Sequence, residues 1–391
     1  MSDIYQKSLI AHKAWKGKLR IELNAPITNK EELSLAYTPG VAEPCREIHR
    51  NPESVYDYTW KGNTVAVITD GTAVLGLGDI GPHASLPVME GKCALFKSFA
   101  DIDAVPIALD TKDPDEIIRI CKALAPSFGG INLEDISAPR CVQIERELKR
   151  SLSIPVFHDD QHGTAIVVAA GLINALKLVK KEFKDLKVVV SGAGAAGSSI
   201  MYMLRDLGVI NILGFRKEGI ILKEEHTDFL VQELSEFTNP SQLNVSLQEA
   251  MVNADVFIGV SAPKLVSKSM IQSMNKHSIV FALANPEPEI SYEDAKEAGA
   301  YIIATGRSDY PNQVNNVLAF PGLFRGALDA KATQISEEMK KAAAYGLSSL
   351  IQTEELNPDY IIPSVFDKRV KDVVSQAVKD VAIASGCVRI S

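Results

Sequence analysis

The stretch Phe157-His158-Asp159-Asp160-Gln161-His162-Gly163-Thr164 organises the chain. It follows a short apolar segment over 154–156, which predicts a strand, and it precedes a long apolar segment over 165–178, which predicts a buried helix. Asp159 and Asp160 therefore stand where a strand ends and a helix begins. In open α/β sheets ligands bind at that end of the strands. Adjacent like charges are costly unless a cation or a donor neutralises them, so we expect a divalent metal ion nearby.

A second acidic pair, Glu134 and Asp135, follows the apolar segment one predicted strand earlier. The ends of successive parallel strands share an edge, so Glu134, Asp135 and Asp160 are expected to converge. Three carboxylates that leave two or three coordination positions open suit Mg²⁺ or Mn²⁺. Acidic residues at strand ends also serve as helix caps, which is the alternative for either pair taken alone. His158 and His162 suggest zinc, but the usual zinc spacings are absent, and we interpret both as packing or supporting residues.

Outward from this stretch, strand-like and helix-like segments alternate. The predicted strands are 64–69, 104–109, 130–133 and 154–157, and the predicted helices are 84–100, 114–124, 139–151 and 161–181. Such alternation predicts an α/β fold with right-handed crossovers and a parallel sheet. Residues 1–36 have the apolar spacing of an amphipathic helix, Pro39-Gly40 breaks it, and a further helix is expected over 41–50.

A glycine-rich turn follows the next predicted strand, 186–190. Gly192, Gly194 and Gly197 fit G-x-G-x-x-G, with Ala193, Ala195 and Ala196 between them. The motif lies between a β-branched strand and a helix expected to end near Leu207, which is the context of a Rossmann dinucleotide site. The three glycines permit the turn, the approach of the pyrophosphate and close helix packing. The alternative is a glycine turn without a ligand. Further strands are predicted over 209–215, 256–260, 279–283 and 301–304, and helices over 337–350 and 367–385.

The predicted division is an N-terminal α/β catalytic domain over 1–160 and a Rossmann-type domain with C-terminal helices over 161–391. The fingerprint expects an acidic residue for the cofactor's 2′-hydroxyl at the end of the second strand. Phe215 occupies that end, followed by Arg216 and Lys217. NADP is therefore an open alternative to NAD, although two cations in a turn are also ordinary.

Composition narrows the class of protein. The chain has 391 residues, with 41 Lys and Arg against 49 Asp and Glu, and no basic block stands out. This argues against binding of nucleic acid or of anionic membranes. The five cysteines are scattered without a C-x-x-C pair, which predicts reduced thiols in a cytoplasmic protein.

Two side chains are candidates for proton transfer. Lys92 begins an apolar helical segment after a glycine-rich loop, where desolvation would lower its pKa toward the range of a general base. A surface lysine is the alternative. Tyr37 stands on the turn before Thr38-Pro39-Gly40, where a purely structural role is the alternative.

The set of motifs resembles the malic enzyme family in its shorter bacterial form, over nearly the whole chain. The matching segments are Ala36-Tyr37-Thr38-Pro39-Gly40-Val41-Ala42, Thr69-Asp70-Gly71, Leu75-Gly76-Leu77-Gly78-Asp79, Glu90-Gly91-Lys92, Leu133-Glu134-Asp135, 157–164, Gly192-Ala193-Gly194, Ala284-Asn285-Pro286, Asn315-Asn316-Val317 and Phe320-Pro321-Gly322. The resemblance implies oxidative decarboxylation of (S)-malate to pyruvate and CO₂ with reduction of NAD or NADP. It also implies decarboxylation of oxaloacetate.

The resemblance implies roles for single residues as well. Metal ligands would be Glu134, Asp135 and Asp160. Asp159 would orient Lys92, which takes the proton of the C2 hydroxyl while hydride leaves C2. The metal would then act as a Lewis acid and stabilise the enolate formed as CO₂ departs.

The remaining steps fall to other residues. Tyr37 would protonate C3 of enolpyruvate, and Asn285 and Asn315 would bind the substrate carboxylate or the cofactor. Family members form dimers or larger assemblies, so we expect a homo-oligomer whose interface includes the N-terminal helices.

This sequence departs from the family pattern at two positions. Ala73 stands where larger eukaryotic-type members have an arginine that holds the substrate carboxylate, and Phe215 stands where many bacterial members have an aspartate and use NAD. We favour NAD. The competing hypotheses are an oxaloacetate decarboxylase without redox activity and a nucleotide-sensing regulator.

Overall fold

Two sheets form the frame of the protein, in a computed structural model that describes residues 2–224 and 226–389. The first sheet has the order β2-β1-β3-β4 and is parallel throughout. Its strands are β1 (Thr64–Thr69), β2 (Asp103–Ala108), β3 (Gly130–Leu133) and β4 (Val156–His158). Helices cover both of its faces, which confirms the predicted α/β class.

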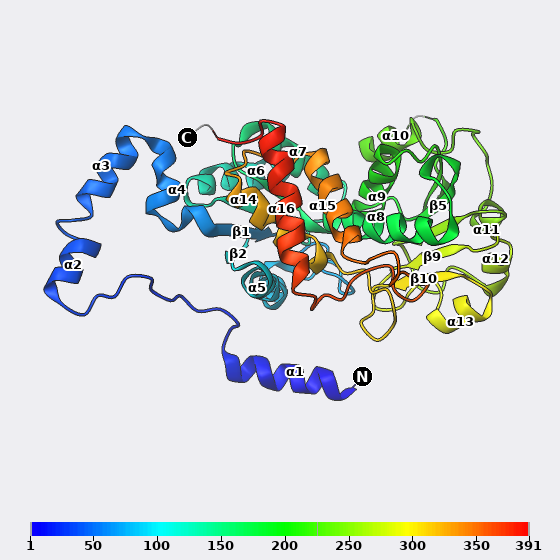
Figure 1. Cartoon of the computed structure of the whole chain (residues 1–391), viewed down its shortest axis with the longest axis horizontal. Coiled ribbons are helices and arrows are strands. Elements are labelled where there is room, and N and C mark those ends of the chain that lie inside the picture. The colour runs from blue at the N-terminus through cyan, green and yellow to red at the C-terminus, as the bar shows by residue number, and fades with distance from the viewer. Residues whose placement is uncertain (1, 225, 390–391) are drawn as a thin grey trace.

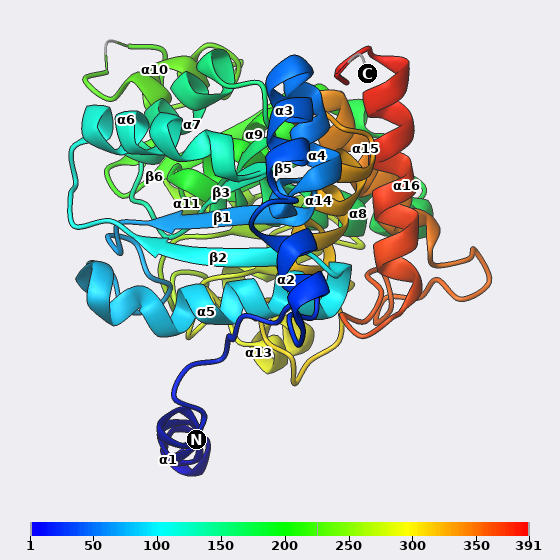
Figure 2. The same ribbon diagram turned by 90° about the vertical axis from the view of Figure 1, so that its left-hand side faces the viewer.

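The alternation of side chains along β1 explains this layering. Val65 and Val67 belong to the core shared with α5 (Gly81–Ala100), whereas Ala66 and Ile68 belong to the core shared with α6 (Pro114–Leu124) and α7 (Arg140–Ser151). Successive side chains of a strand point to opposite faces, so an uninterrupted apolar strand needs cover on both. Figure 2 shows α5 on one side of β1 and β2, and α6 and α7 on the other.

The second sheet has the order β10-β9-β8-β5-β6-β7. Its strands are β5 (Lys187–Ser191), β6 (Asn211–Arg216), β7 (Gly219–Ile220), β8 (Val256–Gly259), β9 (Ile279–Ala282) and β10 (Ile302–Thr305). All pairs are parallel except β6 with β7, a short hairpin that the sequence analysis did not predict. Five helices connect the strands: α9 (Ala195–Asp206), α10 (Phe229–Ser235), α11 (Leu247–Met251), α12 (Lys268–Gln272) and α13 (Tyr292–Glu297). The parallel strands give the second half the expected Rossmann-type architecture.

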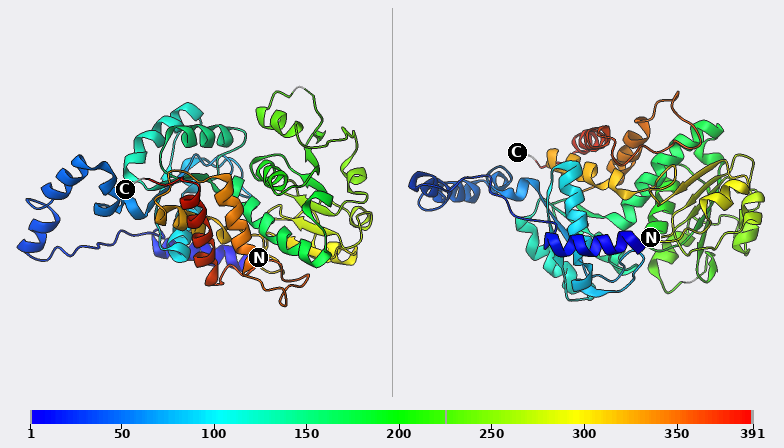
Figure 3. Two further views of the ribbon diagram at one scale, coloured as in Figure 1. Left: turned by 45° about the horizontal axis from the view of Figure 1, so that its top comes forward. Right: turned by 90° about the horizontal axis from the view of Figure 1, so that it is seen from below.

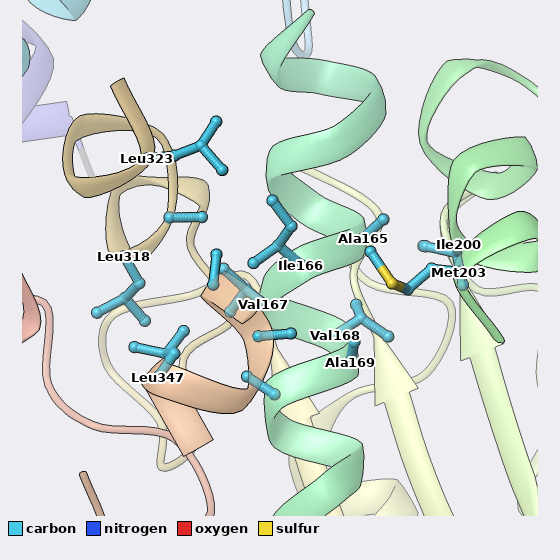
Figure 4. Close-up of a cluster of buried hydrophobic side chains, with 14 of the residues drawn as sticks. Ala165, Ile166, Val167, Val168, Ala169, Ile200, Met203, Leu318, Leu323 and Leu347 are labelled. Atoms are coloured by element: carbon cyan, nitrogen blue, oxygen red, sulfur yellow. The ribbon is translucent and has the colours of Figure 1, made fainter. Parts of the chain in front are cut away.

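Helix α8 (Asp159–Val179) joins the two halves and is buried along most of its length. Leu318, Leu323 and Leu347 lie on one side of it, and Ile200 and Met203 of α9 lie on the other (Figure 4). The helix is long and apolar enough to cross a membrane by composition, but most of that stretch is buried within the protein. Apolar burial on both sides makes α8 the central core element on which both halves are built.

The chain returns to the first sheet after β10. Helices α14 (Phe320–Asp329), α15 (Glu337–Ser349) and α16 (Arg369–Ala384) pack beside the first half of the chain (Figure 1). The rings of Phe320 and Phe324 meet Phe96 of α5 edge-on, with centroids 4.8 and 5.3 Å apart. The division at 160/161 stays a prediction, and the packing of α14 on α5 joins part of the second segment to the first sheet.

The predicted continuous helix over 1–36 is wrong in its middle. The structure has α1 (Ser2–Trp15) and α2 (Lys30–Ala36) with no helix over 16–29. Lys16 and Gly17 both have positive φ, 54° and 106°, a conformation that ends a helix because its hydrogen bonding cannot continue. The helix expected over 41–50 is present as α3 (Ala42–Arg50), followed by α4 (Val55–Tyr58). Residues 2–50, the N-terminal arm, carry α2 and α3 away from the body of the protein (Figures 1 and 3).

Candidate active site

Three carboxylates converge at the ends of β3 and β4. Strand pairing aligns Leu133 with His158, so the residues that follow these strands share one edge. One oxygen from each of Glu134, Asp135 and Asp160 lies within 4.8 Å of the others. The backbone N–H of Asp135, a residue with φ of +54°, donates to Asp160 Oδ2 at 2.9 Å. We call Glu134, Asp135 and Asp160 the carboxylate cluster.

The electrostatics of the carboxylate cluster suit a divalent cation. Burial raises the pKa of Glu134 well above its ordinary value, and burial together with the charge of Asp160 raises the pKa of Asp135 to about 8. Asp135 Oδ2 is buried and has no hydrogen-bond donor in the part of the chain that the structure describes. Three carboxylates whose oxygens converge are hard ligands of the kind that Mg²⁺ and Mn²⁺ prefer, so these residues fit the expected metal.

Lys92 of α5 reaches this cluster from the other side. Its Nζ lies 2.8 Å from Glu134 Oε1 and 2.6 Å from Asp159 Oδ2, and it sits 4.3 Å from the centre of the Phe320 ring. The predicted lowering of the Lys92 pKa is wrong. Burial does oppose the charged form, but the carboxylates of Asp159 and Glu134 outweigh burial and raise the pKa. The sequence shows the apolar helix but not these two partners.

Asp159 is wholly buried and holds Lys92 together with a residue that the sequence analysis passed over. Asn316 donates from Nδ2 to the same Asp159 oxygen that accepts from Lys92. Gly163 leaves room for this arrangement, since a Cβ there would stand 2.0 Å from Asp159 Oδ1. The Oδ1 of Asn315 accepts a hydrogen bond from Val317 N and caps the short helix η5 (Asn316–Leu318), and the predicted binding of substrate or cofactor by Asn315 stays a prediction. The sequence signal for Asn316 was its place beside Asn315, since either member of an adjacent pair of asparagines could face the site.

The other predicted residues occupy different surroundings. Tyr37 ends α2 on the N-terminal arm and is 65% exposed, so a single chain does not bring it to the carboxylate cluster. Asn285 is exposed in the loop after β9. A Cβ at Gly76 would lie 3.6 Å from Pro286, so the glycine-rich loop of the first half touches the loop that carries Asn285. Ala73 donates its N–H to Asp135 O at 2.9 Å, so the backbone at this position adjoins a residue of the carboxylate cluster, while its methyl group carries no charge.

The glycine-rich turn has the geometry of a phosphate site. Gly192 has φ of +111°, and a Cβ on it would meet Val260 O at 2.8 Å. A Cβ on Gly197 would stand 1.8 Å from Gly192 O, so close packing of α9 on the turn requires glycine. At Gly194, in contrast, a Cβ would meet nothing within 4 Å, which leaves the start of α9 open. Free backbone N–H groups and the helix dipole at such an end attract phosphate, so the turn fits a dinucleotide.

The end of β6 differs from what the sequence alone indicates. Phe215 is buried in the core, and Arg216 pairs with Glu218 at 2.7 Å across the turn before β7. Arg216 is thus already engaged by a carboxylate. An acidic residue, Glu218, thus stands three residues beyond the expected position, in the turn between β6 and β7.

A carboxylate cluster beside a buried lysine, on a chain whose second half is a dinucleotide-binding fold, defines a two-domain oxidoreductase. The chain belongs to the malic enzyme family. The model of the malic enzyme N-terminal domain matches residues 16–149, and that of the malic enzyme NAD binding domain matches residues 161–385.

Individual relatives agree with this assignment. The chain is 55% identical to the bifunctional malic/malolactic enzyme of Bacillus subtilis, over 100% of this chain and 95% of that protein. It is also 55% identical to the NAD-dependent malic enzyme of Geobacillus stearothermophilus, over 95% of this chain and 78% of that protein. The crystal structure of the NAD-dependent malic enzyme from Thermotoga maritima superposes with a TM-score of 0.92 at 49% identity, covering 95% of this chain and 98% of that one.

Proposed function

We propose that the protein is an NAD-dependent malic enzyme that converts (S)-malate and NAD to pyruvate, CO₂ and NADH, and that also decarboxylates oxaloacetate. The observation that carries this proposal is the contact of Lys92 with Asp159 and Glu134 at the edge of the carboxylate cluster. Oxidation of a hydroxyl carbon needs a base for the hydroxyl proton beside a site that can polarise the same oxygen. The contact of Lys92 with Glu134, a member of the carboxylate cluster, supports this pairing.

The division of work follows from these contacts. Lys92 would accept the C2-hydroxyl proton while a bound nicotinamide supplies the hydride acceptor. Asp159 holds the Nζ of Lys92, and Asn316 in turn donates to the same Asp159 oxygen. Glu134, Asp135 and Asp160 would hold the divalent cation, Mg²⁺ or Mn²⁺, which when bound supplies Lewis-acid stabilisation of the developing enolate. Lys92 can act as a base only when the negative charge of its carboxylate partners is engaged elsewhere, because those partners otherwise keep it protonated.

The hairpin after β6 supports NAD over NADP. Glu218 neutralises Arg216, the cation nearest the expected ribose position, which weakens its attraction for a 2′-phosphate. The Geobacillus relative at 55% identity is NAD-dependent, whereas the NADP-dependent relative of Salmonella typhimurium is 47% identical and matches over half its length. Initial rates with malate, Mn²⁺ and each nucleotide test this. A higher kcat/KM with NADP would reverse the assignment.

A second candidate function is a non-redox conversion of malate to lactate and CO₂. The Bacillus subtilis relative, which matches over the whole of this chain, is named a bifunctional malic/malolactic enzyme. Its name supports malolactic activity as the second candidate. Malate-dependent NADH formation, with pyruvate and lactate quantified in the same reaction, separates the outcomes. Lactate without net NADH, or activity only on oxaloacetate, would reject the main proposal.

We further propose that the N-terminal arm packs on a second copy of this chain, in a homodimer or larger assembly. The arm exposes several large apolar side chains to solvent, which is unfavourable unless another surface covers them. These side chains are Ile4, Leu9, Ile10, Trp15, Leu33 and Leu35. Contiguous exposed apolar surface is typical of an interface. The arm also carries Tyr37, the proposed proton donor to C3. Packing of the arm on a second copy would therefore bring the phenol of Tyr37 to the active site of that copy. A stable, active monomer by light scattering would contradict this.

The thiols support a cytoplasmic location. All five cysteines are free, and Cys93, Cys121 and Cys141 are buried. Burial raises the pKa of each of these three thiols to about 12, so they are unreactive core residues. Free thiols without disulfides are usual in a reducing compartment.

A further inference from the structure

A chain of charged groups, with Lys340 and Glu145 buried and Glu337 and Lys149 nearer the surface, lies behind the first turn of α8. None of the steps above uses it. Lys340 of α15 places Nζ 2.6 Å from Glu337 Oε1 and 3.1 Å from His162 Nδ1. His162 Nε2 lies 2.9 Å from Glu145 Oε2 of α7, and Lys149 Nζ lies 2.9 Å from the other oxygen of Glu145. Lys340 is 1% exposed and Glu145 is 3% exposed. These contacts connect α7 and α8 with α15, which lies far from both in sequence.

The donors and acceptors of this chain fix the state of the imidazole. An ammonium group has only donors, so His162 Nδ1 must accept from Lys340. The imidazole is therefore neutral, and its proton is on Nε2, from which it donates to the carboxylate of Glu145. The partner of Nδ1 can only donate, and the partner of Nε2 can only accept. A 180° flip of the ring would therefore break both hydrogen bonds.

The turn held in this way is the one that presents Asp159 and Asp160. The His162 ring also lies 5.5 Å from the ring of Phe157, the residue two positions before Asp159. On the same turn, Gly163 lies against Asp159 and Asn316. The backbone between Phe157 and Gly163 is thus packed from both sides, and the imidazole is its polar attachment to α7 and α15.

We propose that Lys340 is a positioning residue, which holds His162 in one tautomer and orientation and so fixes the turn that aims Asp160 at the carboxylate cluster and Asp159 at Lys92. This inference rests on the proposed function, because it takes the cluster to be the metal site. Outer partners that orient metal ligands commonly contribute about 10- to 100-fold to metal affinity. Lys340 would do so through one intervening side chain and the helical turn.

A purely structural role in balancing buried charge is the alternative, and Lys149 separates the two. Lys149 binds Glu145, the carboxylate to which His162 also donates. It carries the same charge as Lys340 but is not a hydrogen-bond partner of His162. Lys149→Met is therefore the matched control for Lys340→Met. Both variants remove one cation from the same group of charges, and Lys340→Met alone removes the donor to Nδ1.

The test is a titration of Mn²⁺ into metal-free protein, with free Mn²⁺ followed by electron paramagnetic resonance, so that binding is read without turnover. Lys340→Met is expected to weaken Mn²⁺ binding about tenfold and to lower kcat for malate more than it changes KM. Lys149→Met is expected to stay within about twofold of the wild type. Equal weakening in both variants, or wild-type Mn²⁺ binding by Lys340→Met, would overturn the inference.

Two further variants keep the test readable if Lys340→Met folds poorly. The double variant Lys340→Met with Glu337→Gln removes the carboxylate left without its partner, so the charge balance is retained while the donor to His162 is still lost. It is expected to bind Mn²⁺ as weakly as Lys340→Met. Lys340→Gln restores an N–H donor without a charge and is expected to recover part of the affinity. Wild-type protein that binds no Mn²⁺ would overturn the metal site itself, an outcome distinct from normal binding by Lys340→Met.

Discussion

Lys92 and Tyr37, the two groups proposed to move protons, occupy opposite environments in the same chain. Lys92 is 7% exposed and is held by two carboxylates and an aromatic face. Tyr37 is 65% exposed, at the end of a helix that has no buried residue. The position of the proposed base is thus fixed by contacts within the core of one chain. The acid stands on the N-terminal arm, whose position in the working enzyme depends on what covers it.

This difference separates the two halves of the reaction. Under the proposed function, proton removal at C2 involves Asp159 and Glu134, which belong to the same chain as Lys92. Protonation of C3 would involve the phenol of Tyr37, which a single chain leaves exposed. We therefore expect a substitution that impairs proton removal at C2 to inactivate the site of the chain that carries it. We expect a substitution that impairs protonation of C3 to inactivate the site of the second copy on which the arm packs.

The largest effect is expected from Lys92→Ala. Loss of a general base typically reduces the rate by two to four orders of magnitude, and we expect a fall of about 10³-fold in malate-dependent NADH formation. Lys97→Ala is the matched control. Lys97 lies on the same helix but is exposed and pairs with Asp101 and Asp103, so its removal should leave turnover unchanged. Substantial malate oxidation by Lys92→Ala would exclude it as the base.

The next effect tests whether the arm serves its own chain or a neighbour. Tyr37→Phe should lower pyruvate formation by about 100-fold, and Tyr58→Phe, another exposed tyrosine, should not. Two differently tagged inactive variants, Lys92→Ala and Tyr37→Phe, are then co-expressed and the mixed assembly is purified. A site built from the intact lysine of one chain and the intact tyrosine of the other should regain activity.

The mixed assembly gives an unambiguous result in either case. If Tyr37 acts on its own chain, each site of the assembly lacks one of the two groups and activity stays at the level of the parents. Recovery well above both parents is expected instead. Parental activity in a mixed assembly that is verified by both tags would reject the exchange of arms.

The comparison also explains how far the sequence could be interpreted. The strands were predictable because their apolar segments are short and the turns between them are polar, and β1 and β3 have the predicted ends. Convergence of Glu134 with Asp160 followed from the rule that parallel strands end at a common edge. These features depend on periodicity and topology alone.

Other features depend on contacts that a sequence does not contain. The pKa of Lys92 moves upward because two carboxylates from β3 and α8 face it, and their distance is a result of folding. Asn315 and Asn316 differ by one position, and the turn of η5 decides which side chain reaches Asp159. The apolar spacing over 1–36 was visible, but the break at Lys16 and Gly17 was not deduced from it.

The smallest effect concerns two glycines that flank the ion pair of Lys92 and Asp159. Gly163→Ala would place a methyl carbon 2.0 Å from Asp159 Oδ1 and 3.0 Å from Asn316 Cβ, so both side chains must shift. We expect the free energy of unfolding to fall by about 1–3 kcal/mol, as is usual for overpacking. Displacement of Asp159 should lower kcat about tenfold, because catalysis is sensitive to small misplacements.

Gly91→Ala is the matched control within helix α5. Gly91 precedes Lys92, and a Cβ there would meet nothing within 4 Å. Alanine in a helix interior is more stable than glycine by about 0.5–1 kcal/mol, so this variant should unfold at a slightly higher denaturant concentration with unchanged kcat. Denaturant unfolding and steady-state rates of both variants measure the two effects. The two glycines differ mainly in the atoms that an added Cβ would meet. Normal turnover in Gly163→Ala would therefore mean that displacement of Asp159 does not impair catalysis. That result would contradict the proposed restraint of Lys92 by the first turn of α8.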